Sequence, residues 1–489
     1  MANYFGIDFG TTNSAVVAIA TDVDGNKVSE LQIGEERRPL PSYVAIHKTT
    51  GVVQTGLEAK NSISDMEEYA VFSSIKSIIG EDKEWEIAGK TWTQIDIAAE
   101  LFKAMKNNVK QRANMKLERA VVAVPIGFSS VKKNNIRKAA KKAGIDVTMF
   151  ISEPTAAYCS RSDIMKKYHN VAVFDWGGGT LDVIVLRVEG SIIRELATAG
   201  IPLAGNDIDR KLAERICLMV AHKKNIDFSM DDLSSDIQLR LMSICEQAKC
   251  NLADEDLATI TMARLGDYGR VLEKIDYNYF SLLIENEVER AVDCLMKALH
   301  DAGMNAESID CILCEGGSSR LRPLQTRLLQ IFDRKKLVFP RQAMWDIGTG
   351  AADVAYKPGS YTLNKPIGVM LSNNRFYPLL KVGQRVPTEE KTISFGVVEK
   401  TKEARFIMTD GETEKDQTFT EYFPMKLRGF SDEIIKLSCY IDADMVFRMK
   451  VWTNRTPDEY FRVWTYSNLK VSYDIDAPLP DVENDDVQA

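Results

Sequence analysis

Two short segments place an aspartate, glycines and threonines between runs of apolar residues. The first, GIDFGTTNSAVVAIA at residues 6–20, contains Asp8, Gly10, Thr11, Thr12 and Asn13. The second, VAVFDWGGGTLDVIVL at residues 171–186, contains Asp175, Gly177, Gly178, Gly179, Thr180 and Asp182. Glycine lets backbone N–H groups approach phosphate oxygens, threonine hydroxyls add hydrogen bonds, and aspartate holds Mg²⁺, generally through water. The pair predicts two loops that grip a nucleoside triphosphate and its metal from opposite sides.

The residues that follow the glycines indicate strand–turn–strand units. Ala15–Ala20 and Val183–Val188 are rich in β-branched residues, which disfavour a helix. A Walker A loop or a dinucleotide fingerprint would open a helix instead. Either segment alone could be a hairpin with a glycine turn and no ligand. Their repetition in the same order favours phosphate binding and predicts two duplicated subdomains with the nucleotide in the cleft between them.

A third glycine segment, ILCEGGSSRLRPLQ, stands at residues 312–325. An apolar strand ends at Gly316, Gly317 and Ser318 and turns into a helix that begins near Pro323. Glycines here would let an adenine ring lie against the backbone, and the planar guanidinium of Arg320 could stack on that ring. Alone this segment is a weak signal, but as the third member of an ordered series it supports a nucleotide site.

The elements around these segments alternate between strand and helix up to about residue 355, which indicates an α/β domain. Apolar, β-branched runs bounded by turn residues predict six strands: Tyr4–Asp8, Ala15–Ala20, Arg119–Val124, Asn170–Asp175, Asp182–Val188 and Cys311–Cys314. Longer periodic segments predict seven helices: Ile95–Asn114, Val131–Ala143, Pro154–Ser162, Ile208–Lys223, Leu233–Asn251, Tyr277–Ala302 and Pro323–Phe332. In the long Tyr277–Ala302 helix, Leu282, Val288, Cys294 and Leu295 are expected on one face.

The pattern changes after Pro358. Short alternating runs recur from Ile367, including ARFIMTD, IIKLSCYID and MVFRMKVW, and they predict a compact antiparallel β domain. We therefore expect four parts: an ATPase domain at 1–357, a linker at 358–364, a β-sandwich at 365–477 and an acidic disordered tail at 478–489.

Composition narrows the class of function. The chain has 62 Lys and Arg against 70 Asp and Glu, a net charge of −8, which argues against nucleic-acid binding. No apolar run is long enough to cross a bilayer, and Met1–Phe9 does not resemble a secretory signal, so the expected location is the cytoplasm. Among the eight cysteines, Cys311 and Cys314 have C-x-x-C spacing, which is compatible with a redox or zinc role, but the chain has four His and no second such pair. Cys311 and Cys314 lie in an apolar run and are expected to be buried structural residues.

The ordered motifs resemble those of the heat-shock protein 70, or DnaK-type, family within the actin and hexokinase superfamily. IDFGTTNS, FDWGGGTLDV and CEGGSSRLRPLQ resemble its three signatures, the last with Glu315 where an apolar residue is usual. ISEPTAAY at 151–158, VPIGFSS at 124–130 and SIKSIIG at 74–80 resemble its hinge, switch-proline and catalytic-lysine segments. LNKPIGVML and the IDAD at 441–444 resemble parts of its peptide-binding sandwich.

The resemblance implies a role for each matching residue. Lys76 would position the attacking water and stabilise charge on the γ-phosphate, and Glu153 would orient that water or relay to the switch residues Pro125 and Lys133. Thr180 would contact the γ-phosphate. The implied metal ligands are Asp8, Asp175 and Asp182, and Asp207 would lie near a K⁺ ion. The implied nucleotide-binding residues are Gly10, Thr11, Thr12, Asn13, Gly177, Gly178, Gly179, Gly205, Glu246, Lys249, Gly316, Gly317, Ser318 and Arg320.

The resemblance implies an α/β actin-like ATPase domain followed by an all-β sandwich. It implies slow ATP hydrolysis to ADP and phosphate with Mg²⁺, extended or unfolded polypeptide clients, a J-domain co-chaperone and a nucleotide exchange factor. Four features depart from the family: PGSYTLN replaces the apolar linker at 358–364, Met149 and Ser152 replace the Arg and Asn used in J-domain docking, Lys133 replaces an Arg, and no helical lid follows the β domain. We therefore expect a lidless chaperone-like ATPase.

Three alternatives share the superfamily but differ in function. A small-molecule kinase would need an additional catalytic aspartate and a second substrate pocket, for which the sequence offers no distinct motif. An actin-like filament former would not be expected to carry a β domain. A nucleotide-sensing scaffold, whose β domain binds one dedicated partner, is favoured by the altered linker and J-domain positions.

Overall fold

A computed structural model describes residues 2–340, 343–371, 373, 375–397, 402–411, 413, 417, 419–430, 432–455, 462–467 and 469–475. The described chain divides into two compact units. The first contains Met1–Arg187 and Leu196–Tyr356, and the second contains Val188–Glu195 and the chain from Lys357 onward. The expected tail at 478–489 lies outside the described residues.

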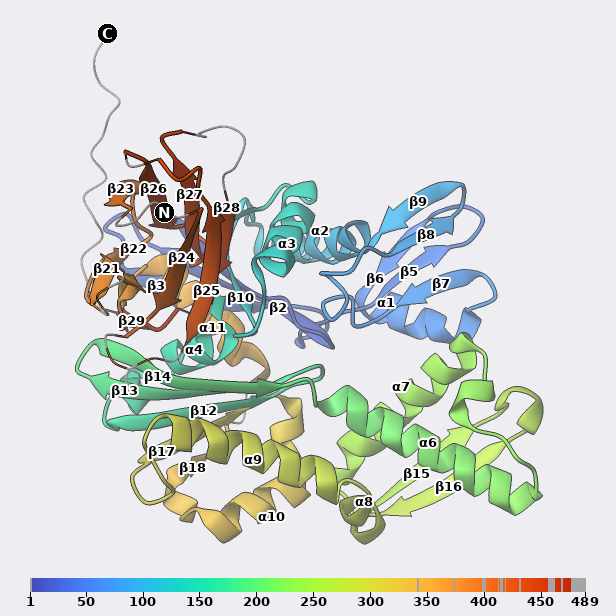
Figure 1. The fold of residues 1–489 in the computed structure, drawn as a ribbon. Coiled ribbons are helices and arrows are strands. Elements are labelled where there is room, and N and C mark those ends of the chain that lie inside the picture. The colour runs from blue at the N-terminus through green and yellow to red at the C-terminus, as the bar shows by residue number, and fades with distance from the viewer. Residues whose placement is uncertain are drawn as a thin grey trace. The chain divides into compact units, whose positions relative to one another are not determined.

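The first sheet of the larger unit runs in the order β11-β10-β1-β2-β3, with β4 paired to β2. Strand β1 is antiparallel to β2 and parallel to β10, and β10 is parallel to β11. Their bounds are β1 Asn3–Asp8, β2 Asn13–Thr21, β3 Lys27–Ile33, β4 Leu40–Pro41, β10 Arg119–Val124 and β11 Asp146–Ser152. Helices α2 (Gln94–Ala113) and α3 (Ser130–Lys142) lie side by side and pack on it through a shared apolar core (Figure 1).

The second sheet of this unit repeats the same topology. Its order is β18-β17-β12-β13-β14, with β12 antiparallel to β13 and parallel to β17, and β17 parallel to β18. Their bounds are β12 Asn170–Trp176, β13 Leu181–Glu189, β14 Ile192–Ile201, β17 Cys311–Glu315 and β18 Leu337–Val338. Because β1–β2 and β12–β13 occupy equivalent places, the two aspartate–glycine loops become the tips of two equivalent hairpins.

Two helices that follow equivalent strands pack against each other in the larger unit. α4 (Glu153–Cys159) follows β11, and α11 (Ala343–Tyr356) follows β18. A Cβ atom added at Gly350 of α11 would lie 1.7 Å from the carbonyl oxygen of Ala156 in α4, so the two helices are in backbone contact. Gly6 of β1 touches α11 in the same way. Small residues at these crossings therefore hold the first sheet, α4 and α11 close together.

Each half of the larger unit carries further elements. The first half adds β5 Val44–His47, β6 Val53–Thr55, α1 Gly56–Asn61, β7 Tyr69–Phe72, β8 Glu84–Ile87 and β9 Lys90–Thr93. The second half adds α5 Ser162–Met165, α6 Gly205–Lys224, α7 Ser235–Leu252, β15 Leu257–Met262, β16 Val271–Asp276, α8 Tyr277–Leu283, α9 Glu285–Asp301 and α10 Arg322–Ile331. Figure 1 shows α6, α7 and the β15–β16 hairpin grouped together, and they share one apolar core with α9 and α10.

The second unit is built from antiparallel strands. One four-stranded sheet has the order β21-β20-β24-β25 and another β23-β26-β27-β28. Their bounds are β20 Ile367–Met370, β21 Phe376–Leu380, β23 Lys391–Gly396, β24 Glu403–Thr409, β25 Thr420–Lys426, β26 Ile434–Ile441, β27 Phe447–Thr453 and β28 Arg462–Tyr466. The rings of Phe395 in β23 and Phe406 in β24 lie 5.9 Å apart, so side chains of the two sheets touch.

The segment expected as a linker, 358–364, contains strand β19 (Ser360–Leu363). β19 pairs with β22 (Arg385–Val386) and with β29 (Val471–Asp474), and β29 also pairs with Ile192–Arg194 of β14. Asn364 strengthens this arrangement because its side-chain amide donates to the carbonyl oxygens of Glu195 and Val471. These residues all belong to the second unit.

All six strands predicted in the α/β region are present, and Cys311 and Cys314 are buried as expected. The single helix predicted at Tyr277–Ala302 is wrong, because the chain breaks at Ile284 into α8 and α9. The break changes which residues face the core. Leu282 is 71% exposed, whereas Val288, Cys294 and Leu295 are buried.

Candidate functional site

The two aspartate–glycine hairpins meet at their tips. A Cβ atom added at Gly178 would lie 2.1 Å from the Thr12 hydroxyl oxygen, and one added at Gly179 would lie 2.7 Å from the Thr11 hydroxyl oxygen. The threonines of the first loop therefore face the glycine backbone of the second. This brings hydroxyls and bare backbone together, which is the arrangement that phosphate recognition requires.

The third glycine loop and the start of α6 converge on the second hairpin. The Gly205 N–H donates to the Gly177 carbonyl oxygen over 3.0 Å, and the Asn206 N–H donates to the Gly178 carbonyl over 2.9 Å. The Ser318 hydroxyl donates to the same Gly177 carbonyl over 2.8 Å. The predicted residues Gly177, Gly205 and Ser318 thus come together although they are far apart in the sequence.

A buried ion pair lies beside these loops. Lys76 Nζ donates to Glu153 Oε1, and both side chains are over 90% buried. Glu153 is the first residue of α4, where Ser152 caps the helix by accepting the Thr155 N–H. Ser152, a departure from the family pattern, therefore has a local structural role. Because α4 begins directly after β11, the central sheet fixes where Glu153 points.

Three carboxyls surround this pair with too little positive charge to balance them. Burial raises the pKa of Asp8 to about 7, and Glu153 adds to the rise while Lys76 opposes it. Burial also raises the pKa of Asp182 to about 6 and that of Asp175 well above its usual range. Burial lowers the pKa of Lys76, but Glu153, Asp8 and Asp182 outweigh this effect and raise it. The cluster is thus an electrostatic site that favours a cation.

The donor set fits a hydrated divalent cation. Asp8 and Asp175 occupy equivalent positions at the ends of β1 and β12, and Asp182 stands opposite Asp175 on β13. In the described part of the chain, no three His, Cys, Asp or Glu side chains lie close enough to ligate one ion directly. Magnesium keeps several waters when proteins bind it, so contact through water is compatible with this spacing.

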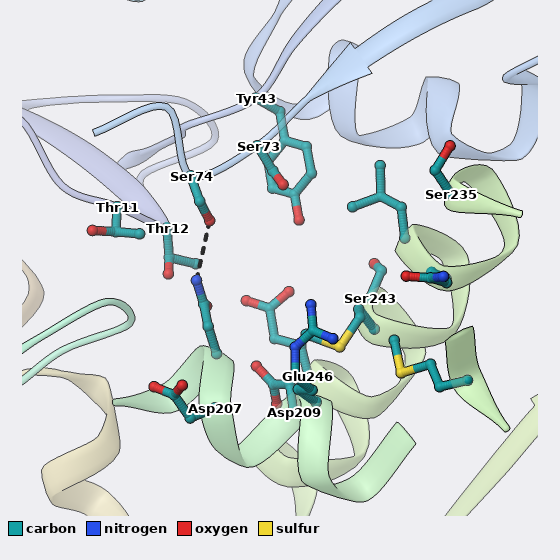
Figure 2. Close-up of a pocket in the computed structure, with 16 residues that line it drawn as sticks. Thr11, Thr12, Tyr43, Ser73, Ser74, Asp207, Asp209, Ser235, Ser243 and Glu246 are labelled. Atoms are coloured by element: carbon teal, nitrogen blue, oxygen red, sulfur yellow. Dashed lines mark hydrogen bonds between the residues drawn. The ribbon is translucent and has the colours of Figure 1, made fainter. Parts of the chain in front are cut away.

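A cavity of about 340 Å³ opens beside the first glycine loop. Figure 2 shows Thr11, Thr12, Tyr43, Ser73 and Ser74 on one side of it, with Asp207, Asp209 and Glu246 opposite. We call it the cleft pocket. The side-chain amide of Asn206 donates to the Ser74 hydroxyl over 3.1 Å, which links its two walls. One carboxylate oxygen of Asp209 is buried and has no hydrogen-bond partner among the described residues.

Two of the residues expected around adenosine are held by other side chains. Glu246 Oε2 accepts from Lys60 Nζ over 2.8 Å, which joins α7 to α1. Lys249 Nζ donates to Asp209 Oδ2 over 2.8 Å and to the Gly205 carbonyl over 3.0 Å. Sequence reasoning did not identify Lys60 or Asp209. No local pattern marks either residue, because each contact joins elements distant in the chain.

The other predicted residues lie around this centre. Asp182 accepts hydrogen bonds from the Thr180 hydroxyl and from the N–H of Ile126, the residue after the predicted switch Pro125. Asp207 accepts the Ala204 N–H at the start of α6 over 2.8 Å and lines the cleft pocket. The Arg320 side chain is more than half exposed and lies 3.7 Å from Asp254. Lys133 is half-buried on α3. Their individual roles stay predictions.

A model of the Hsp70 protein family matches residues 82–342, more than half of the chain. The chain belongs to the Hsp70 family. This membership implies an actin-like ATPase domain, in agreement with the mixed α/β architecture, and supports a chaperone-type, ATPase-type function. Members of the family generally bind nucleotide with Mg²⁺, unfolded clients and co-chaperones. Among the described residues, no helix is long and apolar enough to span a membrane.

Proposed function

We propose that this chain binds ATP with Mg²⁺ and hydrolyses it slowly to ADP and phosphate. The observation that carries the proposal is the meeting of two equivalent hairpin tips beside the buried Lys76–Glu153 pair. A structural ion pair alone would not explain why three further carboxyls gather there at an electrostatic cost. Phosphoryl transfer depends mainly on positioning and charge stabilisation, and this inventory supplies both.

In the proposed reaction, water attacks the γ-phosphorus and ADP leaves with the bridging oxygen. Thr11, Thr12 and the backbone of Gly177–Gly179 would hold the phosphate chain. The Lys76 ammonium, fixed by Glu153, would stabilise negative charge on the transferred group. Glu153 is itself fixed at the start of α4, so it would orient the attacking water without rearrangement.

The metal-binding residues in this proposal are Asp8, Asp175 and Asp182, acting through water. A bound Mg²⁺ would neutralise charge on the β- and γ-phosphate oxygens. Thr180 would face the γ-phosphate, and its hydroxyl bond to Asp182 would orient both groups. Asp207 would lie near a K⁺ ion at the start of α6. Glu246, Lys249, Ser318 and Arg320 would surround the nucleoside.

We propose that the second unit is a β-sandwich that binds extended polypeptide. Apolar residues alternate along the strands of both four-stranded sheets. The buried ones include Met408, Met425, Leu437 and Val451. Among the described strands, each four-stranded sheet ends in strands that are paired on one side only, and an extended peptide can add to such an edge through backbone hydrogen bonds. Binding without a helical lid stays a prediction.

One observation favours a second candidate function, a nucleotide-sensing scaffold with one dedicated partner. The segment at 358–364 forms β19, which is held between β22 and β29. A segment that is paired on both edges is less free to change its position with nucleotide state than an unpaired linker. With β19 fixed in this way, the second unit would present one constant surface to a partner rather than a peptide site that nucleotide regulates.

Single-turnover ATP hydrolysis with and without a panel of unfolded peptides distinguishes these functions. A chaperone ATPase should hydrolyse ATP in the presence of Mg²⁺ and accelerate when peptides bind. Hydrolysis that no peptide changes, together with one stoichiometric partner in a pull-down, would favour the scaffold. Failure to bind or hydrolyse ATP would refute the ATPase.

A further inference from the structure

Glu315 is a buried carboxyl that the proposed reaction does not use. It is the last residue of β17, its exposed fraction is 0%, and neither of its carboxylate oxygens has a donor within hydrogen-bonding distance among the described residues. Burying a carboxyl without a partner is costly, and an apolar side chain would avoid this cost. A structural or functional reason must therefore offset the cost.

The surroundings of Glu315 contain one cation and a second buried carboxyl. Arg161 Nε lies 3.9 Å from Glu315 Oε1, and the same guanidinium donates two hydrogen bonds, of 2.7 and 2.5 Å, to Asp346 Oδ2. Asp346 is 8% exposed and belongs to α11. We call Arg161, Glu315 and Asp346 the carboxyl cluster.

The carboxyl cluster places two buried carboxyls beside a single guanidinium. Arg161 is hydrogen-bonded to Asp346 and lies close to Glu315. Burial raises the pKa of Glu315 well above its usual range, and Asp346 and Asp175 add to the rise. Arg161 thus links Asp346 of α11 to Glu315 at the end of β17.

The three members come from three elements that carry the proposed ATP site. Arg161 follows α4, whose first residue is Glu153, and Asp346 lies in α11, which is in backbone contact with α4. Glu315 precedes Gly316, whose φ is +77° and whose added Cβ would lie 2.4 Å from the Trp176 carbonyl oxygen and 2.6 Å from Asp175 Oδ1. Glu315 and Asp175 are also register partners on neighbouring parallel strands. A shift of Glu315 would therefore move both Gly316 and Asp175.

We propose that the carboxyl cluster is a positioning device, which fixes the third glycine loop and Asp175 relative to the helix that begins at Glu153. Its three residues touch no phosphate in the proposed site and act through these neighbours. The role rests on the proposed ATPase function. It predicts that a polar head group at position 315, close to Arg161, is what the site requires.

Two substitutions of Glu315 distinguish a requirement for a polar head group from a requirement for a negative charge. Glu315→Gln keeps the shape and a side-chain N–H donor but carries no charge, whereas Glu315→Leu keeps the volume and removes the donor. MgATP affinity, the single-turnover hydrolysis rate and the melting temperature are measured for each. Glu287→Leu is the control, because Glu287 is also a buried carboxyl but is paired with Lys211 Nζ at 2.7 Å and lies in α9, away from the loops.

We expect Glu315→Gln to hydrolyse ATP within about twofold of the wild-type rate and Glu315→Leu to be slower by about tenfold or more, as for a misplaced catalytic group. ATP affinity should change less than the rate, and Glu287→Leu should change melting without changing the rate. A wild-type rate in Glu315→Leu, or equal losses in the Gln and Leu variants, would overturn the positioning role. If the wild-type protein fails to bind ATP, both the ATP site and this role are overturned.

Should Glu315→Leu not fold, Arg161→Lys provides the second test. Arg161 is partly exposed, and lysine keeps its charge while losing the two-pronged bond to Asp346. A hydrolysis rate reduced several-fold at unchanged ATP affinity supports the cluster. A wild-type rate in a folded Arg161→Lys protein contradicts it.

Discussion

The ion pair between Lys60 and Glu246 leads to a prediction about nucleotide release. It joins α1 in the first half of the larger unit to α7 in the second half, over 2.8 Å, with side chains 29% and 20% exposed. In the proposed site, a nucleotide bound in the cleft pocket would leave between these halves. Replacing Lys60 with methionine removes the attraction but keeps an apolar stem of similar length, so release of a bound nucleotide should become faster.

The size of the effect follows from the exposure of the pair. Partly exposed ion pairs contribute about 0.2–1 kcal/mol, which corresponds to at most about a fivefold change in rate. Arg240 should limit the loss, because it also joins the halves by donating to the carbonyl oxygens of Ile63 and Ser64 over 2.7 and 3.0 Å. We therefore expect Lys60→Met to accelerate release two- to fivefold, and Lys60→Met with Arg240→Met to accelerate it further.

Stopped-flow release of a fluorescent ATP analogue measures this rate. Glu246→Gln should resemble Lys60→Met, and a protein with both Lys60→Met and Glu246→Gln should be no faster than either single variant, because both substitutions remove the same bond. Lys211→Met, which breaks an ion pair outside the cleft pocket, is the control and should not change release. Additive effects of Lys60→Met and Glu246→Gln, or unchanged release in both, would refute the reasoning.

Three further predictions concern other parts of the chain. Gly316→Ala should lower the free energy of unfolding by about 2 kcal/mol or more and weaken ATP binding, because φ is +77° and the new Cβ would meet backbone. Gly317→Ala is the control, because no atom lies within 4 Å of its new Cβ. In urea unfolding, this control should change stability by less than about 0.5 kcal/mol. Partial burial raises the pKa of Asp96, but hydrogen bonds from Lys142 and Thr93 outweigh it and lower the value to about 2. The Asp96 contribution to stability is therefore present above pH 4 and lost as pH falls toward 2. Urea unfolding at pH 5 and pH 3 should show that Asp96→Asn removes about 1 kcal/mol of this pH dependence, and an unchanged pH dependence would contradict the assignment. If nucleotide state controls the second unit, a fluorescent peptide should dissociate from the protein faster with ATP than with ADP. Equal dissociation rates would exclude coupling between the nucleotide site and peptide binding.

Local sequence patterns predicted the two aspartate–glycine hairpins of the larger unit. Each aspartate–glycine loop lies between two β-branched runs, so neighbouring residues alone determine the hairpin that contains Asp8 or Asp175. The same patterns indicated that two such hairpins would share one ligand. The structure adds that their two sheets repeat one strand order, so the two hairpins occupy equivalent places, and that their tips are in contact.

Contacts between distant elements could not be predicted in this way. The bonds of Lys60 with Glu246 and of Lys249 with Asp209 depend on how α7 packs against α1 and α6, and no spacing in the sequence encodes that packing. The break at Ile284 was missed because α8 and α9 both have apolar residues at helical spacing, which a single longer helix would also show. Likewise, strand β19 at 358–364 depends on partners near residues 385 and 473.

The most direct test of the account is single-turnover ATP hydrolysis by the wild-type protein and Lys76→Ala, with MgATP affinity measured on the same samples. Removing one partner of a buried pair is destabilising, so both proteins are first compared by circular dichroism. We predict that the wild-type protein hydrolyses ATP, and that folded Lys76→Ala binds ATP within about fivefold of wild type but hydrolyses it at least about 100-fold more slowly. An equal loss of binding and hydrolysis, or a wild-type rate in Lys76→Ala, would contradict the role assigned to the Lys76–Glu153 pair.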